Sequence, residues 1–195
     1  MSQLTQALQK TVSWLEKNNP NDLCDLESGL SILEIEKITK DFPFQLSAEV
    51  IELYQFCNGG LHIADDVMTL KSLEEAIESV HLWGGFLSNS HPNFQYNALP
   101  LVNSTGKDIF YTFCEHEKKQ SSPIWYRHIH TEPELCADSL TSLMLAVAEC
   151  SQEDAFYLVE EENEIFTETH GEKCFAIFQK YLPQQADFWH EFWID

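Results

Sequence analysis

His128 and His130 are the residues whose type and spacing most resemble part of a metal site. On a β-strand, residues two apart point to the same face, as two imidazole ligands of one zinc ion would. A third ligand would have to come from Cys114 or His116, across a hairpin. Two histidines at the exposed end of a strand are weak candidates, so we predict no bound metal and no cofactor.

No other motif predicts catalysis. Gly106-Lys107 lacks the leading glycine and the following Ser or Thr of a phosphate loop. The acidic run at 160–164 lacks the ligand spacing of an EF-hand. A hydrolase needs a nucleophile with a partnered base, and no Gly-x-Ser-x-Gly sequence occurs. We therefore predict no catalytic residues and no enzyme activity. An enzyme or metal protein that uses His128 and His130 is the least favoured alternative.

Aromatic and arginine side chains offer a different chemistry, since Trp, Tyr and Arg are enriched at the energetic centres of protein interfaces. Trp83 precedes two glycines in the stretch 83–100, which is rich in Gly, Ser, Asn and His and predicts a long irregular connection. The alternative is that these side chains belong to the core. The candidate partner-binding residues are Trp83, Phe86, Trp125 and Arg127.

The charge of the chain narrows the class of partner. Acidic residues number 32 against 11 Lys and Arg, for a net charge of −21. A field of this sign repels nucleic acid and anionic membranes and speeds encounter with a basic protein. Residues 149–195 alone hold twelve acidic residues and two lysines. We predict a basic protein partner and no direct binding of nucleic acid or membrane, although the acidity would also serve solubility alone.

Cysteine usage and the apolar runs bear on location. The six cysteines are spread singly, without a Cys-x-x-Cys pair, and a chain of 195 residues with 44% hydrophobic residues does not need disulfides. The first residues lack the pattern of a signal peptide, and no apolar run is long enough to span a bilayer. We expect a cytoplasmic protein with reduced thiols and a single domain over 1–195.

The first half of the chain predicts three helices. Apolar residues at helical spacing indicate a leading helix within 1–20. Ser31 and Glu34 have the spacing of a capping box, in which each side chain accepts from the other residue's backbone N–H, for a helix that runs to about Lys40. Ser47 can cap the next helix. The residues that end this helix, by tolerating a positive φ, are Asn58, Gly59 and Gly60.

The second half predicts a hairpin from two runs of aromatic and β-branched residues, 108–114 and 123–130. A helix follows from Asp138 or Ser139, with Leu140, Leu143, Met144 and Val147 on one stripe. Further on we expect a strand at 155–159, a solvated turn at 160–164 and a helix that stops at Pro183. The aromatic tail after this helix is too apolar to remain undocked.

Residues 29–60, GLSILEIEKITKDFPFQLSAEVIELYQFCNGG, resemble the opening signature of the SUKH superfamily, named for the Smi/Knr regulators of cell-wall assembly. The shared features are a capped helix, a loop with a proline, a second helix with a tyrosine, and a closing Asn-Gly. Residues 138–149 resemble the family's later helix, so the likeness covers roughly 22–160. The leading helix at 1–20 and the C-terminal helical extension at 165–195 lie outside it. The proline that usually precedes the second helix of the family falls at Pro43, with Phe44-Gln45-Leu46 intervening.

The resemblance implies an α+β fold in which an antiparallel sheet is flanked by helices. It also implies protein binding and carries no catalytic residues over. Many members resemble immunity proteins that neutralise toxins, often nucleases or deaminases. Our leading hypothesis is therefore a SUKH-type binding module that acts as an immunity protein against a basic toxin domain. The alternative is an intracellular regulatory or scaffold protein of the Smi/Knr type with no toxin partner.

Overall fold

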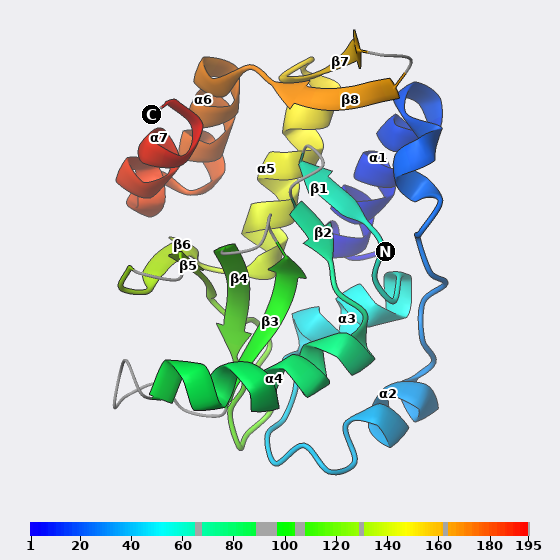
Figure 1. Cartoon of the computed structure of the whole chain (residues 1–195), viewed down its shortest axis with the longest axis vertical. Coiled ribbons are helices and arrows are strands. Elements are labelled where there is room, and N and C mark those ends of the chain that lie inside the picture. Colours follow the sequence, from blue (N-terminus) through cyan, green and yellow to red (C-terminus); the bar gives the residue numbers. More distant parts are fainter. Residues whose placement is uncertain (65–67, 89–96, 104–107, 129–130, 162–163, 195) are drawn as a thin grey trace.

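The computed structural model describes residues 1–64, 68–88, 97–103, 108–128, 131–161 and 164–194, which form a mixed α+β fold (Figure 1). The helices are α1 (Gln3–Asn18), α2 (Ile32–Ile38), α3 (Ala48–Phe56), α4 (Leu73–Ser88), α5 (Leu140–Gln152), α6 (Gly171–Tyr181) and α7 (Ala186–Ile194). The strands are β1 (His62–Ala64), β2 (Met68–Leu70), β3 (Ala98–Asn103), β4 (Asp108–Phe113), β5 (Ile124–His128), β6 (Glu134–Ala137), β7 (Phe156–Glu161) and β8 (Glu164–Thr169).

The larger sheet is an antiparallel meander in the order β1-β2-β3-β4-β5-β6, and β7 pairs with β8 in a separate two-stranded sheet. The predicted hairpin is confirmed as β4 and β5, which pair from Asp108 opposite His128 to Thr112 opposite Ile124. The sequence did not predict β3, because Pro100 cannot donate to a strand ladder. The structure accommodates this proline where the pairing of β3 with β4 shifts its register.

One face of this sheet carries the main core. Leu8 of α1, Leu53 of α3 and Leu143 of α5 converge on strand residues that include Phe110 and Ile124. The predicted apolar stripe of α5 is confirmed, since its four residues are all buried. Side chains alternate along β4, so its odd-numbered residues form a second, smaller cluster on the opposite face. This cluster consists of Ala98, Ile109 and Tyr111, with Phe113 and Trp125 packed against it.

The C-terminal tail docks, as its aromatic content predicted. Trp189 of α7 is 0% exposed, and its indole N–H donates to the backbone carbonyl of Cys136 in the edge strand β6, at 2.7 Å. A single core cluster extends from Leu4 of α1 to Trp189, so the leading helix and the C-terminal extension share one core with the sheet. The last strand of the sheet is thereby covered at one end by a helix, which is a common way to protect an edge.

Two local expectations were wrong. Residues from Trp83 to Ser88 continue α4, where the sequence predicted the start of an irregular connection. Because α4 packs against β3, tertiary contacts override the helix-breaking tendency of its two glycines. Glu160 and Glu161 belong to β7 and Glu164 belongs to β8, although all three were expected in a solvated turn at 160–164. No helix in the described part of the chain is long and apolar enough to cross a membrane.

Candidate functional site

A cleft with a volume of about 310 Å³ lies at the Asn58-Gly59-Gly60 sequence that follows α3. We call it the acidic cleft. Its walls come from the segment after α1, the turn between α3 and β1, the end of β2 and the first turn of α4. Its lining residues are Asp25, Glu27, Asn58, Gly59, Gly60, Thr69, Leu70, Lys71, Ser72 and Glu75.

Asn58 connects the parts of this cleft. Its side-chain carbonyl oxygen accepts a hydrogen bond from the backbone N–H of Leu73 at 2.9 Å, which satisfies one of the free donors at the start of α4. Its amide nitrogen donates to Glu27 and to Glu74, each at 3.2 Å. Asn58 was predicted only to help end α3. Its side chain also caps the start of α4 and donates hydrogen bonds to two carboxylates.

The two glycines allow the walls of the cleft to approach each other. Gly59 has a φ of 101° and Gly60 a φ of 68°, both in the region that favours glycine. A Cβ atom on Gly60 would lie 1.8 Å from the carbonyl oxygen of Asp25, and one on Gly59 would lie 2.7 Å from the backbone nitrogen of Ser72. Any other residue here would force the backbone of the cleft apart.

Carboxylates dominate the charge of the cleft. Asp25, Glu27 and Glu75 are exposed, and Lys71 is the one cation among the lining residues. Burial lowers the pKa of Lys71, against the opposing effect of the nearby Glu75 carboxylate. Glu75 also belongs to the start of α4, because it accepts from the backbone N–H of Ser72 at 3.3 Å. The three exposed carboxylates of the cleft can accept charge-assisted hydrogen bonds from lysine or arginine side chains of a partner.

The structure separates the partner-binding candidates that the sequence indicated. Trp125 and Arg127 lie on the same face of β5, and Trp125 is partly exposed with its ring edge-on to Phe113 at 5.8 Å. Arg127 is only 3% exposed, and its Nε donates to the backbone carbonyl of Thr131 at 3.2 Å. This burial argues against an accessible contact through Arg127. Trp83 and Phe86 lie in α4, but their side chains are outside what the structure describes.

The hairpin register contradicts the proposed third metal ligand. His128 pairs with Asp108, whereas Cys114 and His116 follow β4 at the opposite end of the hairpin. Six strand residues separate the two ends, which amounts to about 20 Å at roughly 3.3 Å per residue. The ring of His116 instead packs against the ring of Phe44 in a tilted arrangement, with 4.9 Å between the ring centroids. His130 lies outside the described residues, and within them no group of three metal-binding side chains occurs.

Three of the buried cysteines are poorly reactive. Burial raises the pKa of the Cys57 and Cys114 thiols to about 12, and it raises the pKa of Cys136 as well. Thiols with such a pKa stay protonated at neutral pH, and the thiolate is the form that attacks substrates and binds metals. All six cysteines are free of disulfides.

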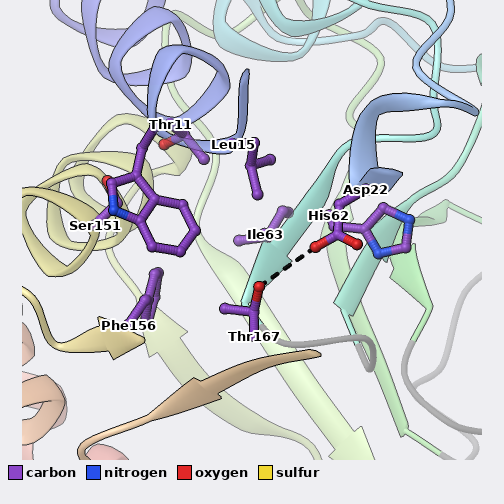
Figure 2. Close-up of a pocket in the computed structure, with 9 residues that line it drawn as sticks. Thr11, Leu15, Asp22, His62, Ile63, Ser151, Phe156 and Thr167 are labelled. Atoms are coloured by element: carbon purple, nitrogen blue, oxygen red, sulfur yellow. Dashed lines mark hydrogen bonds between the residues drawn. The ribbon is translucent and has the colours of Figure 1, made fainter. Parts of the chain in front are cut away.

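A second pocket lies between α1, α5, β1 and β8 (Figure 2). The Thr167 hydroxyl donates to the Asp22 carboxylate there at 3.4 Å, and the hydroxyls of Thr11 and Ser151 donate to carbonyls of their own helices. The enclosed volume is about 10 Å³, which is room for a single water molecule. We interpret this pocket as the junction that attaches the β7–β8 sheet, because a substrate would not fit.

Comparison with protein-family models and with curated proteins finds no match to this chain. The likeness of residues 29–60 to the SUKH signature therefore stays a prediction. The geometry that bears on function is that of the acidic cleft. Sequence reasoning assigned its central residues, Asn58, Gly59 and Gly60, to helix termination alone, and the carboxylates beside them come from segments distant along the chain.

Proposed function

We propose that this chain is a protein-binding module that holds a basic protein at the acidic cleft. The observation that carries the proposal is a formed concavity with three exposed carboxylates, in a chain whose net charge is −21. A basic partner gains from the field of the whole protein during encounter and from local contacts once it is docked.

The partner we favour is a basic toxin domain, such as a nuclease or deaminase, which the chain would neutralise as an immunity protein. The resemblance of residues 29–60 to the SUKH signature supports this choice. A regulatory or scaffold protein of the Smi/Knr type is the second candidate. It would use the same cleft for a partner that is not a toxin, so the identity of the partner separates the two.

The test compares two variants with equal net charge. The cleft variant carries Asp25→Asn, Glu27→Gln and Glu75→Gln, and the control carries Glu172→Gln, Asp187→Asn and Glu191→Gln on α6 and α7. All six residues are exposed, and each variant removes three negative charges. Glutamine at position 75 still allows the hydrogen bond at the start of α4. Proteins captured from host lysate at low and moderate salt are identified by mass spectrometry, and the affinity of the purified partner is then measured.

We expect one basic partner, held more weakly as salt is added and at least tenfold more weakly by the cleft variant than by the control. An equal loss in both variants would show that the general field and not the cleft carries binding. Failure to capture any basic partner, or binding of that partner that does not respond to salt, would contradict the proposal. A basic partner with toxin activity that the chain suppresses would identify immunity over regulation.

A further inference from the structure

A second concave surface lies between α2, the loop that leads to α3, and the loop at 115–120. We call it the lysine-rimmed groove. Its volume is about 280 Å³, and it shares no lining residue with the acidic cleft. Its lining residues are Ile32, Ile35, Glu36, Thr39, Lys40, Phe42, Phe44, Gln45, Leu46, Ile51 and Lys118.

Backbone hydrogen bonds hold the groove open before any partner arrives. The N–H of Gln45 donates to the carbonyl of Glu115 at 2.7 Å, and the N–H of Ala48 donates to the carbonyl of Lys119 at 2.9 Å. Phe42 and Phe44 meet edge to face at 5.6 Å. A partner therefore meets two walls that are already ordered, which reduces the entropy cost of binding.

Apolar side chains are left accessible at the mouth of the groove. Ile32 is 44% exposed and its neighbour Leu33 is 76% exposed, whereas Ile35 one turn further on is buried in the core. Large apolar residues this exposed are few in the described part of the chain, and two of them are adjacent here. A concave surface with a mixed polar and apolar lining and exposed apolar residues beside it is typical of a surface that docks another protein.

The lining of the groove holds more cations than carboxylates, although the exposed acidic residues Asp41 and Glu117 adjoin its two lysines in the sequence. Lys40 and Lys118 line it together with a single acidic residue, Glu36, in a chain where acidic residues outnumber basic ones by 32 to 11. Both lysines are exposed, and neither has a carboxylate partner among the residues that the structure describes. Two free ammonium groups in a groove that is also lined by Phe42 and Phe44 fit a segment that combines a large apolar side chain with carboxylates.

We propose that the lysine-rimmed groove binds an acidic segment of a second partner protein, anchored by one large aliphatic or aromatic side chain. The anchor lies against Ile32, Phe42 and Phe44, and the flanking Asp or Glu side chains of the segment pair with Lys40 and Lys118. This inference does not rest on the acidic cleft. If both surfaces are used, the chain joins a basic protein to an acidic one, which is the behaviour of a scaffold.

The probe is a displayed library of random peptides of about twelve residues, selected on the full chain. The groove is disrupted in the triple variant Ile32→Ser, Lys40→Glu, Lys118→Glu, which takes no part in the selection. The three positions are exposed, so thermal unfolding should show that the variant folds. Selected peptides are then synthesised, and their affinities are measured by fluorescence anisotropy for the native chain, the triple variant and a charge control with Lys17→Glu and Lys173→Glu.

We expect enrichment of peptides with an aromatic or aliphatic anchor next to Asp or Glu. We expect at least tenfold weaker binding to the triple variant and little change in the control. No enrichment, enrichment of basic or purely polar peptides, or equal affinity for the triple variant would overturn the proposal. A dimer seen in sedimentation that the triple variant abolishes would identify a second copy as the occupant and also overturn it. None of these results depends on whether the acidic cleft binds a basic protein.

Discussion

At the scale of single residues, Asn58 shows how one amide supports a fold and shapes a surface. Its oxygen caps α4 and its nitrogen lies between the carboxylates of Glu27 and Glu74. Asn58→Asp keeps an acceptor for the cap but replaces the donor with a negative charge beside two others. We expect the variant to lose about 1–3 kcal/mol of unfolding free energy at neutral pH, because hydrogen bonds to charged groups are lost and repulsion is gained. Urea unfolding measures the loss.

The pH dependence of this loss identifies its cause. Neighbouring negative charges raise the pKa of the introduced aspartate in the folded state above its unfolded value. The penalty is therefore present where the carboxylates are ionised and fades as pH falls through about 4. Asn58→Ser is the control, since it keeps a cap acceptor without adding charge. A loss that is the same at pH 7 and at pH 4 would show that the cap, and not the carboxylates, accounts for it.

Residue-scale prediction succeeded where the partners are close in sequence. The capping box predicted for Ser31 and Glu34 is present, and three residues are enough to specify it. The second role of Asn58 could not be predicted, because Glu27 and Glu74 lie 31 and 16 residues away. The acidic cleft is made of such long-range contacts. Its residues could be read from the sequence, but their positions relative to one another could not be predicted from it.

At the scale of elements, periodicity predicted the helices better than the strands. The stripe of α5 and the β4–β5 hairpin follow from local pattern, and both are confirmed. β3 and β6 were missed, since β3 contains a proline and β6 has only four residues. Both strands are held by neighbours already in the sheet, which a short window of sequence does not show.

The attachment of α7 to β6 gives a prediction for Trp189. Trp189→Phe keeps an aromatic ring in the core but removes the donor to the Cys136 carbonyl, which is left without that hydrogen bond. We expect a loss of about 1–3 kcal/mol in unfolding free energy, because an unsatisfied buried carbonyl is costly. Trp193→Phe is the matched control, since the indole N–H of Trp193 has no hydrogen-bond partner among the described residues. Equal losses in urea unfolding would mean that ring size alone matters.

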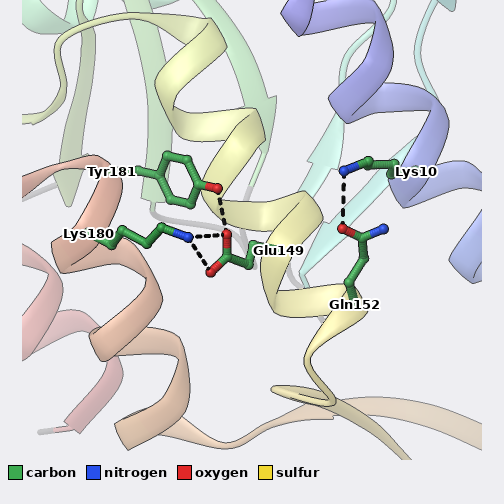
Figure 3. Close-up of polar contacts among 5 residues, drawn as sticks. All are labelled: Lys10, Glu149, Gln152, Lys180 and Tyr181. Carbon is green, nitrogen blue, oxygen red and sulfur yellow. Dashed lines mark hydrogen bonds and ion pairs between the residues drawn. The ribbon is translucent and has the colours of Figure 1, made fainter.

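The contact between α5 and α6 gives a prediction for Glu149, which accepts hydrogen bonds from Lys180 at 2.8 and 2.7 Å and one from Tyr181 (Figure 3). The bonds from Lys180 and then from Tyr181 lower the pKa of Glu149. A lowered folded-state pKa contributes stability above the unfolded value, and this stability is lost as pH falls through the folded one. Glu149→Gln should therefore cost about 1 kcal/mol at neutral pH and almost nothing in acid. A cost that persists in acid urea unfolding would contradict this assignment.

At the scale of the whole molecule, charge sets two properties that respond to salt in opposite directions. A net charge of −21 implies repulsion across the folded surface, and the same field attracts a basic partner. Raising NaCl from about 10 mM to about 150 mM shortens the screening length from about 30 Å to about 8 Å. We therefore expect the urea midpoint of the chain to rise with salt while its affinity for a basic partner falls.

The control variant Glu172→Gln, Asp187→Asn, Glu191→Gln separates these two effects. With three fewer negative charges far from the acidic cleft, it should show a smaller rise of the urea midpoint with salt. Its affinity for the partner should fall with salt nearly as steeply as that of the native chain, since the cleft contacts are intact. A urea midpoint that falls with salt would mean that ion pairs such as Lys180 with Glu149 outweigh the general repulsion. The acidity would then contribute to folding through specific pairs, and the net charge would no longer predict the choice of partner.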